Sequence, residues 1–414
     1  MDRDDSKNMT LIAQNRLDGW GGLGEGMVIQ NASGGRRILW LAHEGPPKNF
    51  TGLDVSNPRK PKVIVQTDLP HTQMRSNSLD LVGDILAVAY QTRGPGGLAD
   101  PGFGMEPAGI EIFDVSTPEA PRTIGFFDCS GPASMGVHQL WFADEKYIHF
   151  AGGAADFQPT VPSDCQFYRS IDVADPTKPV EVGRWWLPGT RVGDDSPPPR
   201  RHPTFDMGFR AHNTNVYPER SDRVYLAYLD AGIFILDIAD MANPKVVGQW
   251  NPHPPYPGFS HTVLPIFDRD LLIVTDECIR DGGEDWPKLT WVIDARDETN
   301  LVPISTLPLP PVEEFGPRGG RYGSHNLHEN QPGSLVSSTL IFGTYFNGGV
   351  RVHDISDPYR PEEVAYYVPA APEGSRAGAV QINDVFVDEN RIVYAVDRHT
   401  GGLYVLELEL ELDL

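Results

Sequence analysis

A short pattern recurs about every 60 residues along this chain. In each copy an apolar run ends in Asp, a β-branched and a small residue follow, and a proline closes the pattern. The first copy reads TGLDVSNPRKP around Asp54. The other copies include one in which Leu301 replaces the proline and one with Glu in place of Asp: Asp114, Asp172, Asp237, Asp294, Asp354 and Glu407. A repeat of this length is typical of a fold built from one unit used many times.

Each repeat has the pattern of four short strands. Two apolar runs precede the Asp strand, as in VHQLWF and KYIHFAGG, and another follows the proline, as in KVVGQW. Glycine (42) and proline (38) together make nearly a fifth of the 414 residues, which is too much for a helical protein. The repeats therefore predict an all-β fold: a single seven-bladed β-propeller with four antiparallel strands per blade.

The chain is expected to form one domain that is closed by its two ends. The last unit supplies three strands, and residues 10–17 (TLIAQNRL) match the missing fourth strand. We therefore predict that the N-terminal strand closes the last blade, which hides the strand edges. Within the single propeller of residues 1–414, the blades are predicted at about 20–70, 71–130, 131–189, 205–252, 258–309, 321–370 and 376–410.

The repeated Asp is expected to have a structural role. Its carboxylate can accept backbone N–H bonds from the turn that follows, and the prolines prevent a helix there. These Asp-[VI]-[SA] units resemble the LVIVD-repeat family of seven-bladed propellers, and the resemblance covers nearly the whole chain. It implies the fold and leaves the function to be argued from the site.

Four predicted innermost strands carry a histidine at the same entry position. They read GVHQLWF, RAHNTNVY, FSHTVLP and GSHNLHEN, and the histidines are His138, His212, His261 and His325. The remaining blades have RSNSLDL, AVQINDVF and EGMVIQ there, so Asn77 and Gln381 are expected to face the channel as substrate-binding residues. Neutral imidazole is a good ligand for Fe, Cu, Ni and Zn. The four histidines are therefore predicted to bind a metal ion on the propeller axis.

Carboxylates stand where the predicted second strands end. They are Glu44, Asp230, Glu277 and Asp397. A carboxylate that accepts the far ring N–H of a histidine would fix its tautomer, so we expect these groups to support the metal ligands. Together with Tyr345 they form the candidate catalytic set.

Four long irregular segments are predicted to lie on the same face as the histidines: 91–109, 188–208, 278–288 and 310–324. Loops of this length in a compact domain form lids or binding loops, or are disordered. Their arginines, Arg93, Arg201 and Arg321 among them, are expected to bind an anionic group of a substrate.

The charge of the chain excludes some partners. A net charge of −23 disfavours binding to nucleic acid or to an anionic membrane surface. The N-terminal residues show no apolar signal region, and no long apolar run predicts membrane insertion, so a cytoplasmic protein is expected. The pattern does not predict an oligomeric state.

The leading hypothesis is a metal-dependent enzyme that acts on a small organic molecule at the mouth of the channel. Four axial histidines on a propeller resemble, in architecture only, the arrangement in carotenoid cleavage oxygenases, which implies a non-haem oxidoreductase with Fe. A Cu-dependent oxidation, as in methanethiol oxidase propellers, fits nearly as well. Zn or Mn as a Lewis acid in a hydrolase, lyase or isomerase is the second hypothesis. A non-catalytic propeller that binds a protein or peptide partner is the third.

Overall fold

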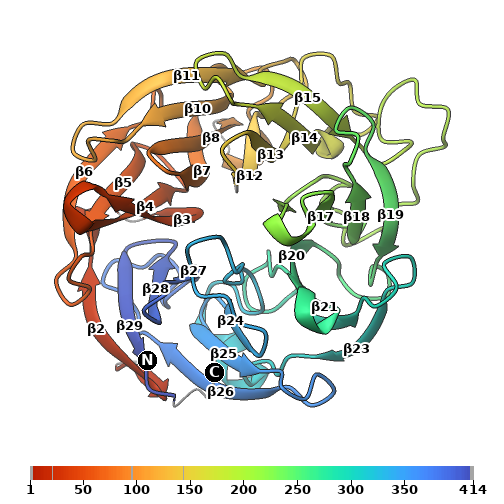
Figure 1. Cartoon of the computed structure of the whole chain (residues 1–414). Coiled ribbons are helices and arrows are strands. Elements are labelled where there is room, and N and C mark those ends of the chain that lie inside the picture. The colour runs from red at the N-terminus through yellow and green to blue at the C-terminus, as the bar shows by residue number, and fades with distance from the viewer. Residues whose placement is uncertain (1–2, 21, 95–96, 143, 411–414) are drawn as a thin grey trace.

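The computed structural model describes residues 3–20, 22–94, 97–142 and 144–410. Antiparallel sheets stand around a central axis like the blades of a propeller, and the chain runs round the ring once (Figure 1). The prediction of an all-β propeller is confirmed. Short helical turns occur only in connections within these residues: η1 Leu17–Gly19, η2 Ser33–Gly35, η3 Pro162–Asp164, η4 Pro218–Arg220, η5 Phe267–Arg269, α1 Val312–Phe315 and η6 Gly316–Arg318.

The first two repeat units share one sheet, because a single pairing of His43 with Ser76 joins their inner strands. The first unit holds β3 Leu23–Ala32, β4 Arg36–His43, β5 Lys48–Asp54 and β6 Lys62–Asp68. The second holds β7 Met74–Val82, β8 Ile85–Gly94, β10 Gly109–Asp114 and β11 Arg122–Asp128, and β9 Gly97–Pro101 pairs with β8.

The next three units are separate four-stranded sheets. The third holds β12 Val137–Trp141, β13 Tyr147–Gly152, β14 Phe167–Asp172 and β15 Val180–Trp185. The fourth holds β16 Thr214–Asn215, β17 Arg223–Ala227, β18 Ile233–Asp237 and β19 Lys245–Trp250. The fifth holds β20 Ser260–Ile266, β21 Leu271–Asp276, β22 Thr290–Asp294 and β23 Val302–Thr306.

The last two units are completed by the N-terminal segment. The sixth holds β24 Leu340–Thr344, β25 Val350–Asp354 and β26 Glu362–Val368, with β1 Asp5–Lys7 added to the edge of β26. The seventh holds β27 Ile382–Val387, β28 Ile392–Asp397 and β29 Leu403–Leu408, and β2 Met9–Asn15 pairs antiparallel with β29. The predicted closure by the N-terminal strand is confirmed, and beside this pairing the Glu409 N–H donates to the Asn8 carbonyl at 3.0 Å. The extra pairing of β1 was not predicted.

The six repeat aspartates each end a strand of their unit, and Glu407 lies within β29. The Asp carboxylate accepts the backbone N–H two residues later, as Asp114 does from Ser116 at 2.9 Å and Asp354 from Ser356 at 2.7 Å. The same bond forms at the other aspartates of the series: Asp54, Asp172, Asp237 and Asp294. The expected structural role of the repeat is thus visible in its hydrogen bonds.

The apolar core lies between neighbouring sheets rather than in one central mass. Its largest cluster joins side chains of the third to sixth units, and further clusters lie between the other sheets. Because the core is distributed round the ring, the axis is left free for polar side chains.

Candidate metal centre on the propeller axis

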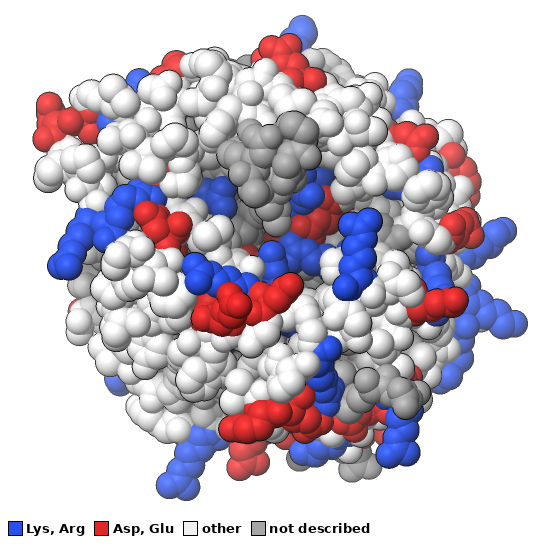
Figure 2. Space-filling view, turned by 180° about the vertical axis from the view of Figure 1, so that it is seen from behind, with Lys and Arg blue, Asp and Glu red and all other residues white. Residues whose placement is uncertain are grey.

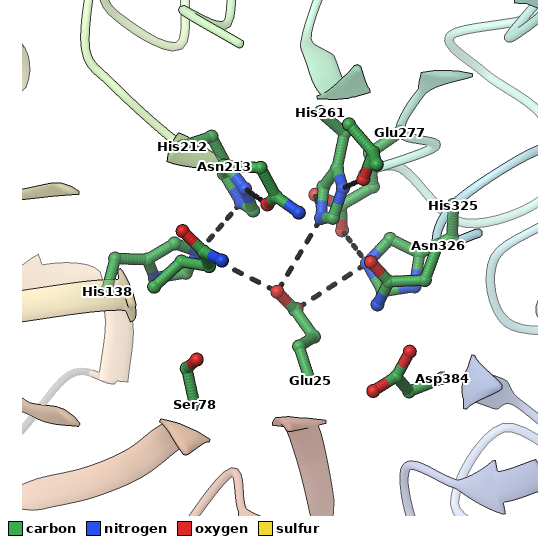
Figure 3. A network of polar contacts seen from close by, with 12 residues as sticks. Glu25, Ser78, His138, His212, Asn213, His261, Glu277, His325, Asn326 and Asp384 are labelled. Atoms are coloured by element: carbon green, nitrogen blue, oxygen red, sulfur yellow. Dashed lines mark hydrogen bonds and ion pairs between the residues drawn. The ribbon is translucent and has the colours of Figure 1, made fainter. Parts of the chain in front are cut away.

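The structure brings His138, His212, His261 and His325 together on the axis (Figure 3). The ring centroids of successive histidines lie 4.3, 3.9 and 4.6 Å apart. All four are buried, and His261 and His325 have no exposed surface. The equivalent positions noted in the sequence therefore form one group.

A local irregularity of the innermost strands turns these side chains toward the axis. The register of β12 with β13 shifts at His138, and that of β20 with β21 shifts at His261. At His212 two consecutive residues bond to one partner: His212 N–H donates to the Ala227 carbonyl, and Ala227 N–H donates to the Asn213 carbonyl. A β-bulge re-aims one side chain in this way and is common beside active sites.

The far ring nitrogens of three histidines have polar partners. The Nδ1 atom of His138 lies 3.1 Å from the Gln91 amide oxygen. The Nδ1 atom of His212 lies 2.9 Å from the Asn213 amide oxygen, and that of His261 lies 2.8 Å from the Thr262 hydroxyl. These contacts orient the rings so that their Nε2 atoms face the axis. The expectation that carboxylates would hold the far nitrogens is wrong, because two amide groups and a hydroxyl occupy three of these positions and Nδ1 of His325 has no hydrogen-bond partner within the described residues.

Glu25 lies at the centre of the histidines, and the sequence analysis did not select it (Figure 3). Its carboxylate oxygens lie 3.5 Å from Nε2 of His261, 3.5 Å from Nε2 of His325 and 3.9 Å from Nε2 of His138. Its side chain is only 5% exposed. A signal was present, since Glu25 begins the EGMVIQ segment that aligns with the histidine strands.

Two glycines explain how Glu25 reaches this position. A Cβ atom at Gly24 would lie 2.5 Å from the Asn77 carbonyl oxygen, and one at Gly26 would lie 2.4 Å from the Leu79 nitrogen. Both distances are impossible contacts with backbone, so only glycine lets β3 approach β7 this closely. The glycine-rich run GLGEG therefore serves strand packing around Glu25 rather than a phosphate-binding turn.

Glu277 is the second carboxylate at this centre. Its carboxylate oxygens lie 3.5 Å from Nε2 of His325 and 3.9 Å from Nε2 of His261, and it accepts a bond from Arg321 at 2.6 Å. Glu277 was predicted as a supporting carboxylate, but it faces the same Nε2 atoms as Glu25.

Two overlapping groups of three ligands result. In each group the potential ligand atoms lie within 4.8 Å of one another: Glu25, His212 and His261 in one, and His261, Glu277 and His325 in the other. His138 is in neither group, and its Nε2 atom lies 2.7 Å from Nε2 of His212.

The protonation states suit a cation. Burial lowers the pKa of His325, and it lowers that of His212 to about 3, so these rings are neutral at pH 7. Burial alone would raise the pKa of Glu25, but the imidazoles of His261 and His325 outweigh it and hold that pKa well below its ordinary value. Neutral imidazoles and ionised carboxylates are the forms that bind metal ions.

Several of these buried atoms also lack hydrogen bonds. Among the described residues, Nε2 of His261, Nε2 of His325 and one Glu25 oxygen have no hydrogen-bond partner. Buried polar atoms without partners are costly, and here they converge on one point. This donor set fits a divalent metal ion.

A cavity of about 470 Å³ opens directly onto this centre. Glu25, His138, His212 and Glu277 form its inner end. Figure 2 shows a hollow at the centre of one face of the molecule, where basic and acidic side chains gather. The size is that of a small-molecule site.

On the other side of Glu25 the channel narrows to a space of about 20 Å³. Glu329 and Asp384 line it, and burial raises the pKa of both carboxyl groups. Two asparagines donate to Glu329, Asn213 at 2.7 Å and Asn215 at 2.8 Å. A space of this size holds about one water molecule, so the larger cavity is the route for a substrate.

Of the predicted catalytic set, only Glu277 lies at this centre; Glu44 pairs with arginines of the cavity wall, and the other three residues lie elsewhere. Asp230 lines a separate cavity of about 660 Å³ and accepts the Met207 N–H. Asp397 accepts backbone N–H bonds from Gln381, His399 and Gly401, which is a turn-forming role. Tyr345 is buried beside His353. None of the three lines the axial cavity among the residues that the structure describes.

Two of the predicted substrate-binding residues line the axial cavity, and the other three do not. Arg93 and Arg321 line the axial cavity, whereas Arg201 binds Asp164 and Asp206 beside the separate cavity. The remaining two are buried without lining the cavity: the Asn77 side chain has no hydrogen-bond partner within the described part of the chain, and Gln381 accepts the Arg321 N–H at 2.8 Å.

Glu44 belongs to a cluster of arginines at the cavity wall. It binds Arg75 at 2.7 Å, Arg93 at 3.4 Å and also Arg398. Burial would raise the pKa of Glu44, but Arg398, Arg75 and Arg93 together lower it to about 2. Glu44 is therefore a fixed anion that holds guanidinium groups in place and does not contact the histidines.

Comparisons with known proteins agree with the fold and do not assign an activity. Residues 222–251, which hold β17, β18 and β19, match the LVIVD repeat, and this confirms the repeat resemblance for that unit. No curated protein matches the chain in sequence. Among solved structures, the Cps50 (Swd1) β-propeller domain of Myceliophteria thermophila is similar, with a TM-score of 0.55 at 13% identity over 93% of this chain and 96% of that one. This likeness concerns the fold alone. No helix in the described ranges is long and apolar enough to cross a membrane.

Proposed function

We propose that this protein is a metal-dependent enzyme that acts on a small organic molecule at the axial cavity. The observation that carries the proposal is the convergence of buried, unpartnered imidazole and carboxylate atoms at the inner end of that cavity. His212, His261, His325, Glu25 and Glu277 would hold the metal ion. His138 would remain beside them, oriented by Gln91 and in contact with His212.

The ligand groups favour non-haem iron and oxidative chemistry. Each group contains two histidines and one carboxylate, which is the donor set of non-haem Fe(II) oxygenases. A bound Fe(II) would supply open coordination positions for oxygen and substrate. The chain itself would orient the imidazoles through Gln91, Asn213 and Thr262, and it would limit water to the cavity side. Copper is the alternative redox metal, because imidazole and mixed nitrogen and oxygen donors also suit Cu(II).

The same donor set supports a second candidate. Imidazole and carboxylate also suit Zn and Mn, and Arg321 beside Glu277 could stabilise developing negative charge in hydrolysis or elimination. Metal identity separates the two candidates.

The test is metal analysis of protein purified without chelators, followed by oxygen uptake in the presence of the bound metal. We expect about one metal ion per chain, and we expect His261→Ala to lose it, because His261 belongs to both ligand groups. The matched control is His202→Ala, at a histidine in the separate cavity, which should retain the metal. Wild-type protein that binds no added Fe, Mn, Zn or Cu would contradict the proposal.

A further inference from the structure

The axial cavity is basic in an acidic protein. Five arginines line it, against three acidic residues, Glu25, Glu277 and Asp206, whereas the whole chain has a net charge of −23. Arg75 and Arg93 come from the second unit and Arg398 from the seventh, and Arg210 and Arg321 lie in the connections before His212 and His325. A concentration of one charge against the opposite background attracts a ligand of the opposite sign.

The arginines carry more charge than their partners neutralise. Arg75, Arg93 and Arg398 all bind the single carboxylate of Glu44. Glu25 faces the imidazoles instead, and Glu277 is engaged by Arg321. Arg398 also lies 4.0 Å from a Glu277 oxygen, so four guanidinium groups share the two carboxylates of Glu44 and Glu277, which leaves an excess of positive charge at this wall.

Some of their N–H donors have no partner. Nε of Arg93 and Nη1 of Arg398 are buried and donate no hydrogen bond within the described part of the chain, and Nη1 of Arg398 lies 4.0 Å from the nearest Glu277 oxygen. Buried donors of this kind gain most from a charged acceptor, and a planar guanidinium fits a carboxylate through two parallel bonds. The wall therefore offers both charge and free donors.

Another part of the cavity is apolar. Its lining includes two phenylalanines, two methionines and one isoleucine: Phe103, Phe259, Met135, Met207 and Ile279. Methionine side chains adapt to ligands of irregular shape. A volume of about 470 Å³ accommodates more than a bare anion.

From this arrangement we infer that the cavity binds a small organic carboxylate, with its acid group at Arg93 and Arg398 and its apolar body against Phe103 and Phe259. The inference deepens the proposed function, since it names the substrate class of the same site. A monoanionic carboxylate is favoured over a phosphate, because Glu25 and Glu277 at the inner end of the cavity repel a dianion more strongly.

The test is calorimetric titration with a graded series: phenylacetate, 4-phenylbutyrate and octanoate as carboxylates, phenylacetamide as the neutral analogue, and acetate and inorganic phosphate as anions without an apolar body. We expect at least one of the larger carboxylates to bind about tenfold or more tightly than phenylacetamide, acetate and phosphate. Equal binding of phenylacetamide, equal binding of phosphate, or no binding of any carboxylate would overturn the inference.

Variants locate the binding. Arg93→Gln and Arg398→Gln should each weaken carboxylate binding by about tenfold or more, whereas Arg122→Gln, the same change at an exposed arginine that pairs with Asp114, should not. Thermal unfolding of each variant identifies any that fail to fold, and the less buried Arg93 is the safer of the two positions. Binding unchanged in folded Arg93→Gln protein would overturn the assignment.

The titration is repeated on metal-free protein and on protein with added metal, so that the two proposals can fail separately. Carboxylate binding without any metal binding would contradict the proposed function and leave the anion site standing. Metal binding without carboxylate binding would contradict the anion site and leave the proposed function standing.

Discussion

Two groups of carboxylates in this molecule, at the outer turns and on or near the axis, differ in where their bonding partners lie. At the outer turns, the repeat aspartates are alike in six units, and each accepts a bond from its own turn, as Asp114 does from Ser116. On and near the axis, Glu25, Glu44 and Glu277 occur once each and bond to groups from other units. The repeated aspartates therefore stabilise turns within single units, whereas the glutamates that occur once connect different units at or beside the axial site.

A carboxyl group in each region has a similarly lowered pKa, but the cause of the lowering differs. The pKa of Asp114 falls to about 2 through the Ser116 turn and Arg122, in a solvent-exposed setting. The pKa of Glu44 also falls to about 2, against a strong burial effect and through Arg398, Arg75 and Arg93. Solvent screens the first case, so only the second is expected to have a large effect on stability.

The largest effect should come from removing the buried anion at the cavity wall. Glu44→Gln leaves three guanidinium groups without their carboxylate, and breaking such a buried ion pair costs about 3 to 5 kcal/mol. We expect the free energy of unfolding, measured with urea, to fall by about this amount. A loss below about 1 kcal/mol would place Glu44 with the solvent-screened turn carboxylates.

The pH dependence of stability should show the same difference. As the pH falls, an unfolded Glu44 takes up a proton near its ordinary pKa of 4.5, whereas the folded one does so only near pH 2. Its contribution to stability, about 3 kcal/mol, is therefore complete above pH 4.5 and is lost as the pH falls toward 2.

The measurement is urea unfolding of wild-type and Glu44→Gln protein between pH 7 and the lowest pH at which both fold. The difference in unfolding free energy should shrink as the pH falls below 4.5. The same comparison with Asp114→Asn should show a much smaller change, because that carboxylate is exposed. Equal changes for the two variants would contradict the distinction between the regions.

Glu25→Gln tests the axial carboxylate with almost no change in shape. It removes the charge that faces His261 and His325, and loss of a metal-ligand charge should weaken metal binding by about 100-fold or more. Competition titration with a chelating dye measures this. Glu329→Gln changes a carboxylate in the narrow part of the channel, lined by the same strands, and should leave the metal affinity within about tenfold.

The smallest effect is expected at the outer turns. Asp172→Ala removes one bond to the Ala174 N–H, which is worth about 1 kcal/mol. Thermal unfolding should detect this loss, and the metal content should stay unchanged. Loss of metal in this variant would mean that the turn aspartates influence the axis, contrary to the division proposed here.

The division between the regions also explains what the sequence could predict. Repeated residues can be recognised in the sequence, so the propeller, the Asp turns and the closing strand could be inferred from the pattern alone. The four histidines were found for the same reason, because they occupy one position in four units. Glu25 occupies the aligned position in the first unit, but it is a different residue type between two glycines, so it does not stand out as a fifth copy of the histidine.

The partners of each side chain could not be inferred, since they depend on the bulges and on contacts between units. The bulge at His261 turns Nε2 to the axis and leaves Nδ1 beside Thr262, and no sequence pattern favours this neighbour over a distant carboxylate. Asp397 ends β28 and Glu44 directly follows β4, so both lie at the ends of second strands as predicted. Glu44, however, forms ion pairs with three arginines, whereas Asp397 accepts hydrogen bonds from backbone N–H groups of its own turn.

Anomalous diffraction from crystals grown without chelators tests the central claim most directly. Data collected on both sides of the absorption edge of the bound metal locate that metal independently of the protein density. We expect one peak on the axis, about 2.0 to 2.3 Å from Nε2 of His261 and from a Glu25 or Glu277 oxygen. A metal bound elsewhere, or no anomalous peak in crystals soaked with Fe, Mn or Zn, would contradict it.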